Sequence, residues 1–416
     1  MDTIVLLKLV AAVGLLLALV IKKVGPHIAM VAASVFLMII CGQGPSEFAE
    51  LLKSYFTNKT VYNMALTIIA ISMLSNVMNK TGMMNRMMDS LDAAVNSPRF
   101  TLMFAPFVIG LLTVAGGAFM SCPLVDAAAK DLDVKPARLA AINLVYRHGI
   151  HFSYPLASTF YMTVALTGCT NGELLRVTLP LSLFMLVLGY ICLVRPLDVP
   201  EKEKRAGTDI GASLGKFLLM ISPIAIALVL AVGFSLPMPA AVLAGTAAAI
   251  AISYSDPVTR PKEDLLKLVF GGINPKTIMV VLAALFFKEV VNHISAIGAA
   301  LTGLAKTGMP PEMIILIVCM LTALPTGSNQ TAVAIANPIA ISFAANPQQA
   351  IMYAALTMAC GFMSYYFSPV HMCQLLTLEY FKTDFADLMK EYKVFMPVLL
   401  LFIAAWYLVM KLIIFA

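Results

Sequence analysis

The stretch LPTGSNQT, residues 324–331, places polar side chains and two helix breakers inside an otherwise apolar run. Pro325 and Gly327 favour a turn, because proline lacks a backbone N–H group and glycine tolerates left-handed conformations. The oxygens of this turn suit a sodium ion, and a helix that starts there would offer free N–H groups to an anion. The residues concerned are Thr326, Ser328, Asn329 and Thr331. The plainer interpretation is a helix cap, but a cap needs only one such residue.

A second constellation lies in the segment INLVYRHGIHFSYPLAST, which contains Arg147, His148, His151 and Ser153. An arginine in an apolar segment is costly and usually functional. Arg147 and His151 are four residues apart and would share one face if the segment were helical there. We expect Arg147 to pair with a substrate carboxylate or, as a structural alternative, with Asp126. The two histidines have no cysteine or glutamate at ligand spacing, which disfavours a metal site.

Two further segments correspond to these in position. GFMSYYFSPVHMCQ repeats the serine–proline break with Ser368 and adds His371, which we interpret as either a proton carrier or a hydrogen-bonded core histidine. VAGGAFMSCP carries Gly116, Gly117 and Ser121 at the predicted tip of a helical hairpin. The seven cysteines lie in or beside apolar runs without paired metal-type spacing, so we interpret them as small core residues.

The elements that hold these residues follow from the composition. The 416 residues are 60% hydrophobic and 12% charged, whereas a soluble protein carries about 25% charged residues. Apolar runs long enough to cross a bilayer as helices recur along the chain, and no run alternates as a membrane barrel strand would. The sequence therefore predicts an all-α polytopic membrane protein with about ten transmembrane helices, two re-entrant hairpins and two broken helices.

Basic residues give the predicted orientation. Twenty lysines and arginines gather in the loops on one side, against five on the other, which places the first side in the cytoplasm and both termini outside. The same bias accounts for the net charge of +6, so no nucleic-acid partner is implied.

The chain divides into two similar halves. ELLKSYFTNKTVYNMAL in the first half matches DLLKLVFGGINPKTIMVV in the second after a two-residue insertion. An odd number of crossings per half would invert the second copy in the membrane, which is the plan of many secondary transporters. The predicted units are a first repeat (1–194, hairpin 101–132, broken helix 139–168), a cytoplasmic linker (195–216) and a second repeat (217–416, hairpin 312–345, broken helix 349–380).

Three segments, GGAFMSCPLVDAA, INLVYRHGIHFSYPL and SPVHMCQLLTLEYFK, resemble an uncharacterised prokaryotic membrane family grouped with the ion-transporter superfamily. Its relatives are divalent-anion/sodium symporters, citrate, gluconate and C4-dicarboxylate carriers, and the large membrane subunits of TRAP systems. The likeness covers about residues 40–385. In the symporters, a Ser-Asn-Thr motif at each hairpin tip contacts sodium and the substrate carboxylate. Ser328, Asn329 and Thr331 resemble that motif with Gln330 inserted, whereas Gly116-Gly117-Ala118 departs from it. The resemblance implies a homodimer with an elevator movement in the cytoplasmic (inner) membrane.

These features predict a secondary active transporter for a small organic anion, a carboxylate or dicarboxylate, coupled to sodium or protons. The alternative is a proton-coupled exporter or exchanger that uses Arg147, His148 and His371. An intramembrane hydrolase is disfavoured because neither H-E-x-x-H nor G-x-S-x-G occurs. We expect no cofactor apart from a sodium ion. The predicted substrate-binding residues are Gly116, Gly117, Ser121, Arg147, His148, His151, Ser153, Gly327, Ser328, Asn329, Thr331, Ser368 and His371.

Overall fold

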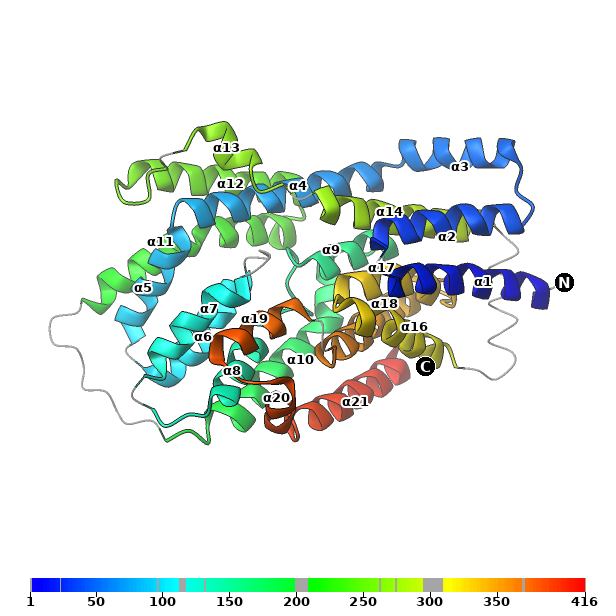
Figure 1. The fold of residues 1–416 in the computed structure, drawn as a ribbon. Coiled ribbons are helices and arrows are strands. Elements are labelled where there is room, and N and C mark those ends of the chain that lie inside the picture. The colour runs from blue at the N-terminus through cyan, green and yellow to red at the C-terminus, as the bar shows by residue number, and fades with distance from the viewer. Residues whose placement is uncertain are drawn as a thin grey trace.

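The computed structural model describes residues 2–22, 24–95, 97–111, 117–130, 132–198, 209–261, 263–273, 275–294, 310–368 and 371–415. Within these ranges every regular element is a helix and none is a strand (Figure 1). The predicted all-α class is therefore confirmed.

The helices follow one another in the same order in each half of the chain. The first half contains α1 (Asp2–Ile21), α2 (Pro26–Ile40), α3 (Pro45–Thr57), α4 (Lys59–Lys80), α5 (Met83–Val95), α6 (Pro98–Leu111), α7 (Gly117–Ala128), α8 (Pro136–His148), α9 (Ser158–Thr167) and α10 (Asn171–Gly189), which continues as η1 (Tyr190–Val194). The second half contains α11 (Ile210–Leu228) with its continuation η2 (Val229–Gly233), α12 (Met238–Ser255), α13 (Leu265–Phe270), α14 (Pro275–His293), α16 (Pro311–Thr326), α17 (Asn329–Ser342), α18 (Pro347–Tyr366), α19 (Met372–Phe381), α20 (Phe385–Glu391) and α21 (Phe395–Phe415).

Local sequence explains where many of these helices begin. Pro45, Pro136 and Pro347 occupy the first turn of their helices, where a missing N–H group costs nothing. Asn58 and Asn346 cap α4 and α18 by accepting a hydrogen bond from a backbone N–H group of the first turn. The helix starts are thus set largely by residues that neighbour them in the chain.

Five helical stretches are long and apolar enough to cross a membrane, and they are Lys59–Lys80, Asn171–Val194, Ile210–Gly233, Met238–Ser255 and Phe395–Ile413. Only 28% of the apolar window in Phe395–Ile413 is buried within the protein. Its outward-facing Leu401, Leu408 and Leu412 are 58% to 72% exposed. Such helices are stable with their apolar faces in lipid, as expected of a membrane protein.

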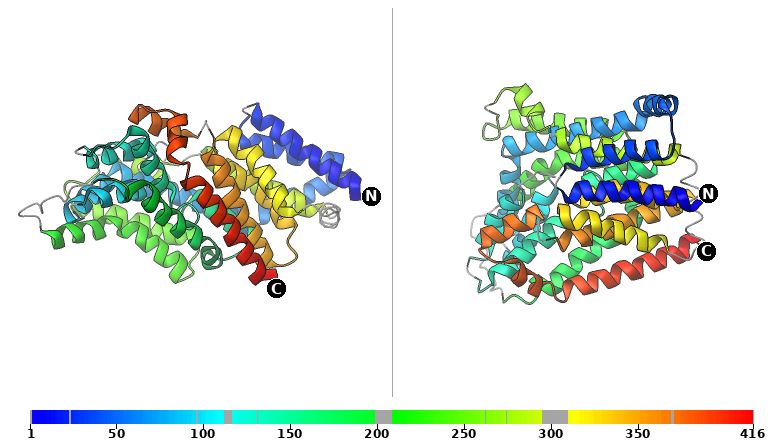
Figure 2. Two further views of the ribbon diagram at one scale, coloured as in Figure 1. Left: turned by 90° about the horizontal axis from the view of Figure 1, so that it is seen from below. Right: turned by 45° about the vertical axis from the view of Figure 1, so that its right-hand side comes forward.

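The outer helices pack in exchanged pairs. Helix α4 packs on α12, and α14 packs on α2. In the same way α1 packs on α2 and α11 packs on α12. In Figure 1 these helices form the upper part of the molecule, and Figure 2 shows α1 and α2 lying at one side of it.

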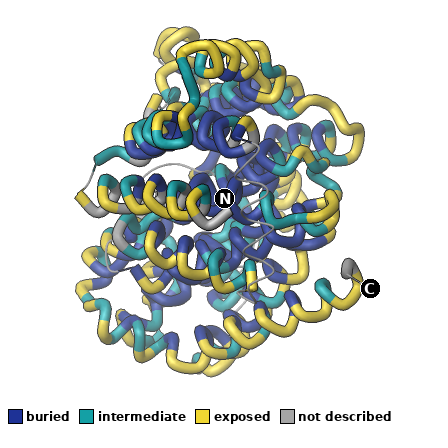
Figure 3. The backbone as a smooth tube through the Cα atoms, turned by 90° about the vertical axis from the view of Figure 1, so that its right-hand side faces the viewer, coloured by how far each residue is buried: buried dark blue, intermediate teal, exposed yellow. Residues whose placement is uncertain are grey.

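The inner helices surround the two helix breaks. Helix α6 packs on α7 and α8, whereas α16 packs on α17 and α18. Each short helix after a break then contacts the other half, because α9 packs on α17 and α19 packs on α7. Asn337 of α17 donates a hydrogen bond to Thr163 of α9 at 3.0 Å, and Asn143 of α8 donates one to Thr377 of α19 at 3.1 Å. Figure 3 shows that the buried backbone concentrates in this inner region.

Both helix breaks are visible in the backbone. Helix α8 ends at His148 and α9 begins at Ser158, with non-helical backbone between them. Pro155 lies in this break, where it cannot donate a helical hydrogen bond. Helix α18 ends at Tyr366 and α19 begins at Met372. Residues 369–370 of the second break lie outside the described residues.

Candidate functional site

Arg147 lies in the last turn of α8, immediately before the first break, and only 6% of it is exposed. Its Nη1 atom is buried and has no hydrogen-bond partner among the residues that the structure describes. Gly110 of α6 lies against it so closely that an added Cβ would sit 2.3 Å from the Arg147 carbonyl oxygen. The glycine therefore lets α6 close over the arginine backbone.

The predicted structural partner of Arg147 is not in place. Asp126 is exposed on α7 and accepts a hydrogen bond from the Tyr380 hydroxyl of α19 at 3.4 Å. The ion pairs found among the described residues include none between Asp126 and Arg147. The expected pair fails because the aspartate occupies the exposed face of its helix, whereas the arginine is buried.

His148 is buried, and two hydrogen bonds fix its ring. Its Nδ1 atom lies 2.8 Å from the Leu144 carbonyl oxygen, which can only accept, so Nδ1 carries the proton. Its Nε2 atom lies 3.1 Å from the Tyr365 hydroxyl of α18. Tyr366 also donates its hydroxyl to the Leu144 carbonyl, at 2.7 Å. The end of α18 thereby positions the histidine that ends α8.

His371 occupies the N-cap position of α19 and is 1% exposed. Neither of its ring nitrogens has a hydrogen-bond partner among the described residues. Its ring centroid lies 3.7 Å from that of Tyr365 and 5.2 Å from that of His148. The two breaks, which are more than two hundred residues apart in the chain, therefore meet at these two imidazoles.

His151 does not share a helical face with Arg147, as the spacing had suggested. Helix α8 ends at His148, so His151 lies in the turn that follows it. Its ring centroid is 5.5 Å from that of His148 and 6.1 Å from that of Phe362. It is a partly buried neighbour of the meeting point of the two breaks.

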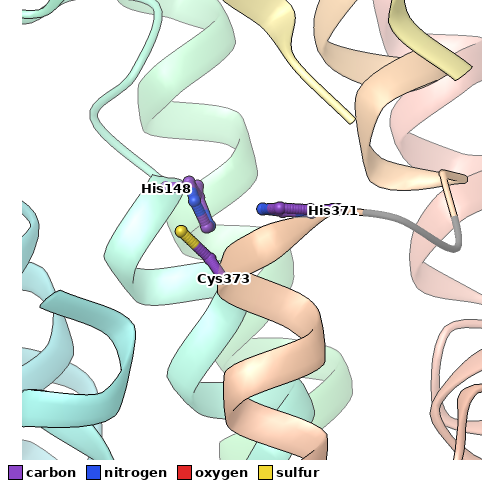
Figure 4. Close-up of side chains that lie close together, drawn as sticks. All are labelled: His148, His371 and Cys373. Carbon is purple, nitrogen blue, oxygen red and sulfur yellow. The ribbon is translucent and has the colours of Figure 1, made fainter. Parts of the chain in front are cut away.

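Cys373 is the residue that the sequence interpretation missed. One nitrogen of His148, one nitrogen of His371 and the Cys373 sulfur all lie within 4.8 Å of one another (Figure 4). The local signal was the His371-Met372-Cys373 spacing at the start of α19. The third member, His148, belongs to a distant segment that no local spacing can reveal.

The tip of the second hairpin is a tight turn between α16 and α17. Gly327 adopts φ +57°, the left-handed conformation that closes α16. Ser328 caps α17 by accepting hydrogen bonds from the Thr331 N–H group at 3.1 Å and the Thr331 hydroxyl at 3.0 Å. Thr326 donates its hydroxyl to the Thr322 carbonyl of its own helix at 2.5 Å. Capping thus accounts for Ser328 and Thr331, the plainer of the two interpretations of this turn.

Asn329 differs from its neighbours at this tip. It is 4% exposed, and its Oδ1 atom is buried with no hydrogen-bond partner in the described part of the chain. It lies against Gly361 of α18, where an added Cβ would come within 2.5 Å of Oδ1. Its carboxamide oxygen is consequently a buried acceptor available to a ligand.

The first hairpin tip is described only in part. Gly116 falls outside the described residues, and Gly117 is the first residue of α7. Ser121 is buried in the second turn of α7 and so does not belong to the tip, as had been predicted. The tip polar groups of the second hairpin have no counterpart among the described residues of the first.

The serines at the two breaks donate their hydroxyl protons to other oxygens. Ser153 donates to the Ser182 hydroxyl of α10 at 2.7 Å, and Ser368 donates to the Leu324 carbonyl of α16 at 2.7 Å. A serine nucleophile needs its proton directed to a base such as histidine. These bonds instead tie each break to a neighbouring helix.

A cavity of about 420 Å³ lies apart from the breaks, between α4, the end of α9, the start of α10 and the turn before α12. The sequence interpretation did not predict it. Its polar lining includes Thr60, Asn63, Thr67, Thr170 and Asn171. Because α9 runs from the first break to this cavity, one short helix contributes to both places.

The fold and this site define an all-helical membrane protein whose buried polar centre lies where two interrupted helices meet. The chain belongs to the family described as "Protein of unknown function (DUF401)", which matches residues 3–413. No curated protein matches the chain.

Proposed function

We propose that this protein is a secondary active transporter that moves a small organic anion, a carboxylate or dicarboxylate, across the cytoplasmic membrane. The single observation that carries the proposal is the buried guanidinium of Arg147, with an Nη1 atom that has no partner in the described residues.

A buried cation without a counter-charge is expensive. Translocon insertion scales put an arginine at the centre of a membrane helix at about 2.5–3.5 kcal/mol. A carboxylate that binds beside Arg147 would recover that cost through charge-assisted hydrogen bonds. Arg147 is therefore suited to a partner that arrives and leaves.

The starts of the two half-helices support anion binding. Helix α9 begins after Ala157 and α19 begins after His371, and neither start has a side-chain cap. Each start therefore leaves free N–H groups and the positive end of a helix dipole beside a break. Discontinuous helices of this kind hold substrate carboxylates in secondary transporters.

Helix order and packing support an inverted repeat. The pairs α4 with α12 and α14 with α2 exchange equivalent helices of the two halves, as do α9 with α17 and α19 with α7. Two copies related by a pseudo-twofold axis produce such exchanged pairs. We further propose from the family resemblance a homodimer with an elevator-type movement.

Asn329 is our candidate for the ion-coupling side chain. Its buried Oδ1 atom lacks a protein donor among the described residues and lies at the turn between α16 and α17. A carboxamide oxygen of this kind suits sodium coordination. A proton-coupled exporter or exchanger is the second candidate, favoured by the imidazole rings of His151 and His371 at 5.5 and 5.2 Å from that of His148.

A thermal-shift screen of carboxylates, with and without sodium, tests the proposal on the purified protein in detergent. A ligand present at a hundred times its Kd stabilises the folded state by about 2.7 kcal/mol. We expect at least one mono- or dicarboxylate to raise the Tm in a concentration-dependent way, and Arg147→Gln to abolish that rise.

Arg138→Gln is the matched control, because Arg138 already has a partner in Glu391 and should leave the ligand response intact. A response confined to low pH and independent of sodium would favour the proton-coupled candidate. An equal response in Arg147→Gln, or no response to any anion tested, would overturn the assignment. Uptake of a positive anion into proteoliposomes would then test transport itself.

A further inference from the structure

We propose that His148, His371 and Cys373 form a binding site for a thiophilic transition-metal ion of the zinc class. The donor atoms lie within 4.8 Å of one another (Figure 4). They come from the end of α8 and the start of α19, so a bound ion would join the two breaks. This inference does not rest on the proposed transport.

The ring of His148 is already oriented as metal-binding histidines usually are. Its Nδ1–H group donates to the Leu144 carbonyl, which leaves the lone pair of Nε2 free to bind an ion. Metal-ligating histidines commonly donate their second nitrogen to a backbone carbonyl, which fixes the tautomer and the ring direction. The Tyr365 hydroxyl, 3.1 Å from Nε2, would give way or become the next neighbour of the ion.

His371 supplies an independent observation. The side chain is 1% exposed, yet neither ring nitrogen has a hydrogen-bond partner among the described residues. Buried polar atoms are normally satisfied, so an imidazole with both nitrogens unpaired calls for an explanation. A metal ion on the nitrogen that faces His148 and Cys373 would provide one.

The donor set selects the kind of ion. Two imidazole nitrogens and one sulfur suit Zn²⁺ and related ions, whereas sodium and magnesium prefer oxygen. Tetrahedral zinc, with bonds of about 2.0–2.3 Å, keeps its donors roughly 3.5 Å apart. The three donor atoms would therefore approach one another by about 1 Å, a shift within the reach of side-chain rotation.

Three protein ligands leave one position of a tetrahedral ion open. Arg147 directly precedes His148 in the chain, so the open position lies near a fixed positive charge. A small anion or a hydroxide would suit that position electrostatically. The site thus differs from a closed structural zinc site.

Cobalt titration tests this proposal on the full-length protein after removal of metals with a chelator. Co²⁺ should bind with one ion per chain and produce the charge-transfer absorption of a thiolate–cobalt bond. Cys373→Ser should remove this absorption, and His371→Ala should weaken binding at least ten-fold. Cys192→Ser is the matched control and should leave the spectrum unchanged, since Cys192 lies in η1.

A second measurement uses the unsubstituted chain and does not depend on how the variants fold. Zn²⁺ should slow alkylation of Cys373 by a maleimide at least ten-fold, as read by mass spectrometry, and leave Cys192 unaffected. The site would be ruled out by absence of the charge-transfer band or by its persistence in a folded Cys373→Ser variant. Equal alkylation of Cys373 with and without zinc would rule it out as well.

Discussion

Replacing Arg147 by methionine should stabilise the protein in the absence of ligand. Methionine has a similar length and no charge, and it fills irregular space in a helix interior. Arg147 is 6% exposed and its Nη1 atom has no partner in the described residues. The insertion cost of a central arginine, about 2.5–3.5 kcal/mol, sets the upper range of the gain. Lost packing around the guanidinium reduces that gain, so we expect about 1–3 kcal/mol.

The assay is thermal unfolding in detergent, followed by the intrinsic fluorescence of the purified variants. Arg138→Met is the control with the opposite sign, because it leaves Glu391 without its partner in a partly buried site. Breaking such a pair is destabilising. We expect the Tm of Arg147→Met to rise and that of Arg138→Met to fall. A fall in both would refute the reasoning, since it would mean that Arg147 has a structural partner that stabilises the fold.

Three further predictions concern the second hairpin tip. Gly361→Ala should lower the Tm, because its Cβ would approach the Asn329 Oδ1 atom to 2.5 Å and overpacking costs about 1–3 kcal/mol; Gly215→Ala, with open space around it in α11, should not lower the Tm. Ser328→Ala should cost about 1 kcal/mol by removing the cap of α17, measured by thermal unfolding, and an unchanged Tm would contradict the capping role. Asn329→Ala should abolish sodium-dependent stabilisation and uptake while the protein stays folded, and unchanged uptake would disprove its coupling role.

Short-range features of the sequence predicted much of the backbone. The apolar composition predicted helices that suit a bilayer, and such helices are present. Gly327 closes one helix and Ser328 opens the next, as a glycine followed by a polar residue commonly does. Pro155 lies in non-helical backbone for an equally local reason. These features depend on neighbours in the chain and are therefore legible without the fold.

The predicted site was less accessible to the same reasoning. Arg147 was expected opposite Asp126, but which face of α7 is buried depends on the packing of α6, α8 and α19 against it. His151 was expected on the face of Arg147, but α8 ends before it. Whether a helix ends at one residue or a turn later is a small local difference that changes which side chains meet.

The sequence by itself determined the class of this protein, because hydrophobic composition and helix-breaking residues act over a few turns. Only the tertiary structure decided that His148 meets His371 and Cys373. Their segments lie more than two hundred residues apart, and no periodicity or spacing connects them. The exchanged packing of the two halves brings the end of α8 to the start of α19, and that contact creates the polar centre.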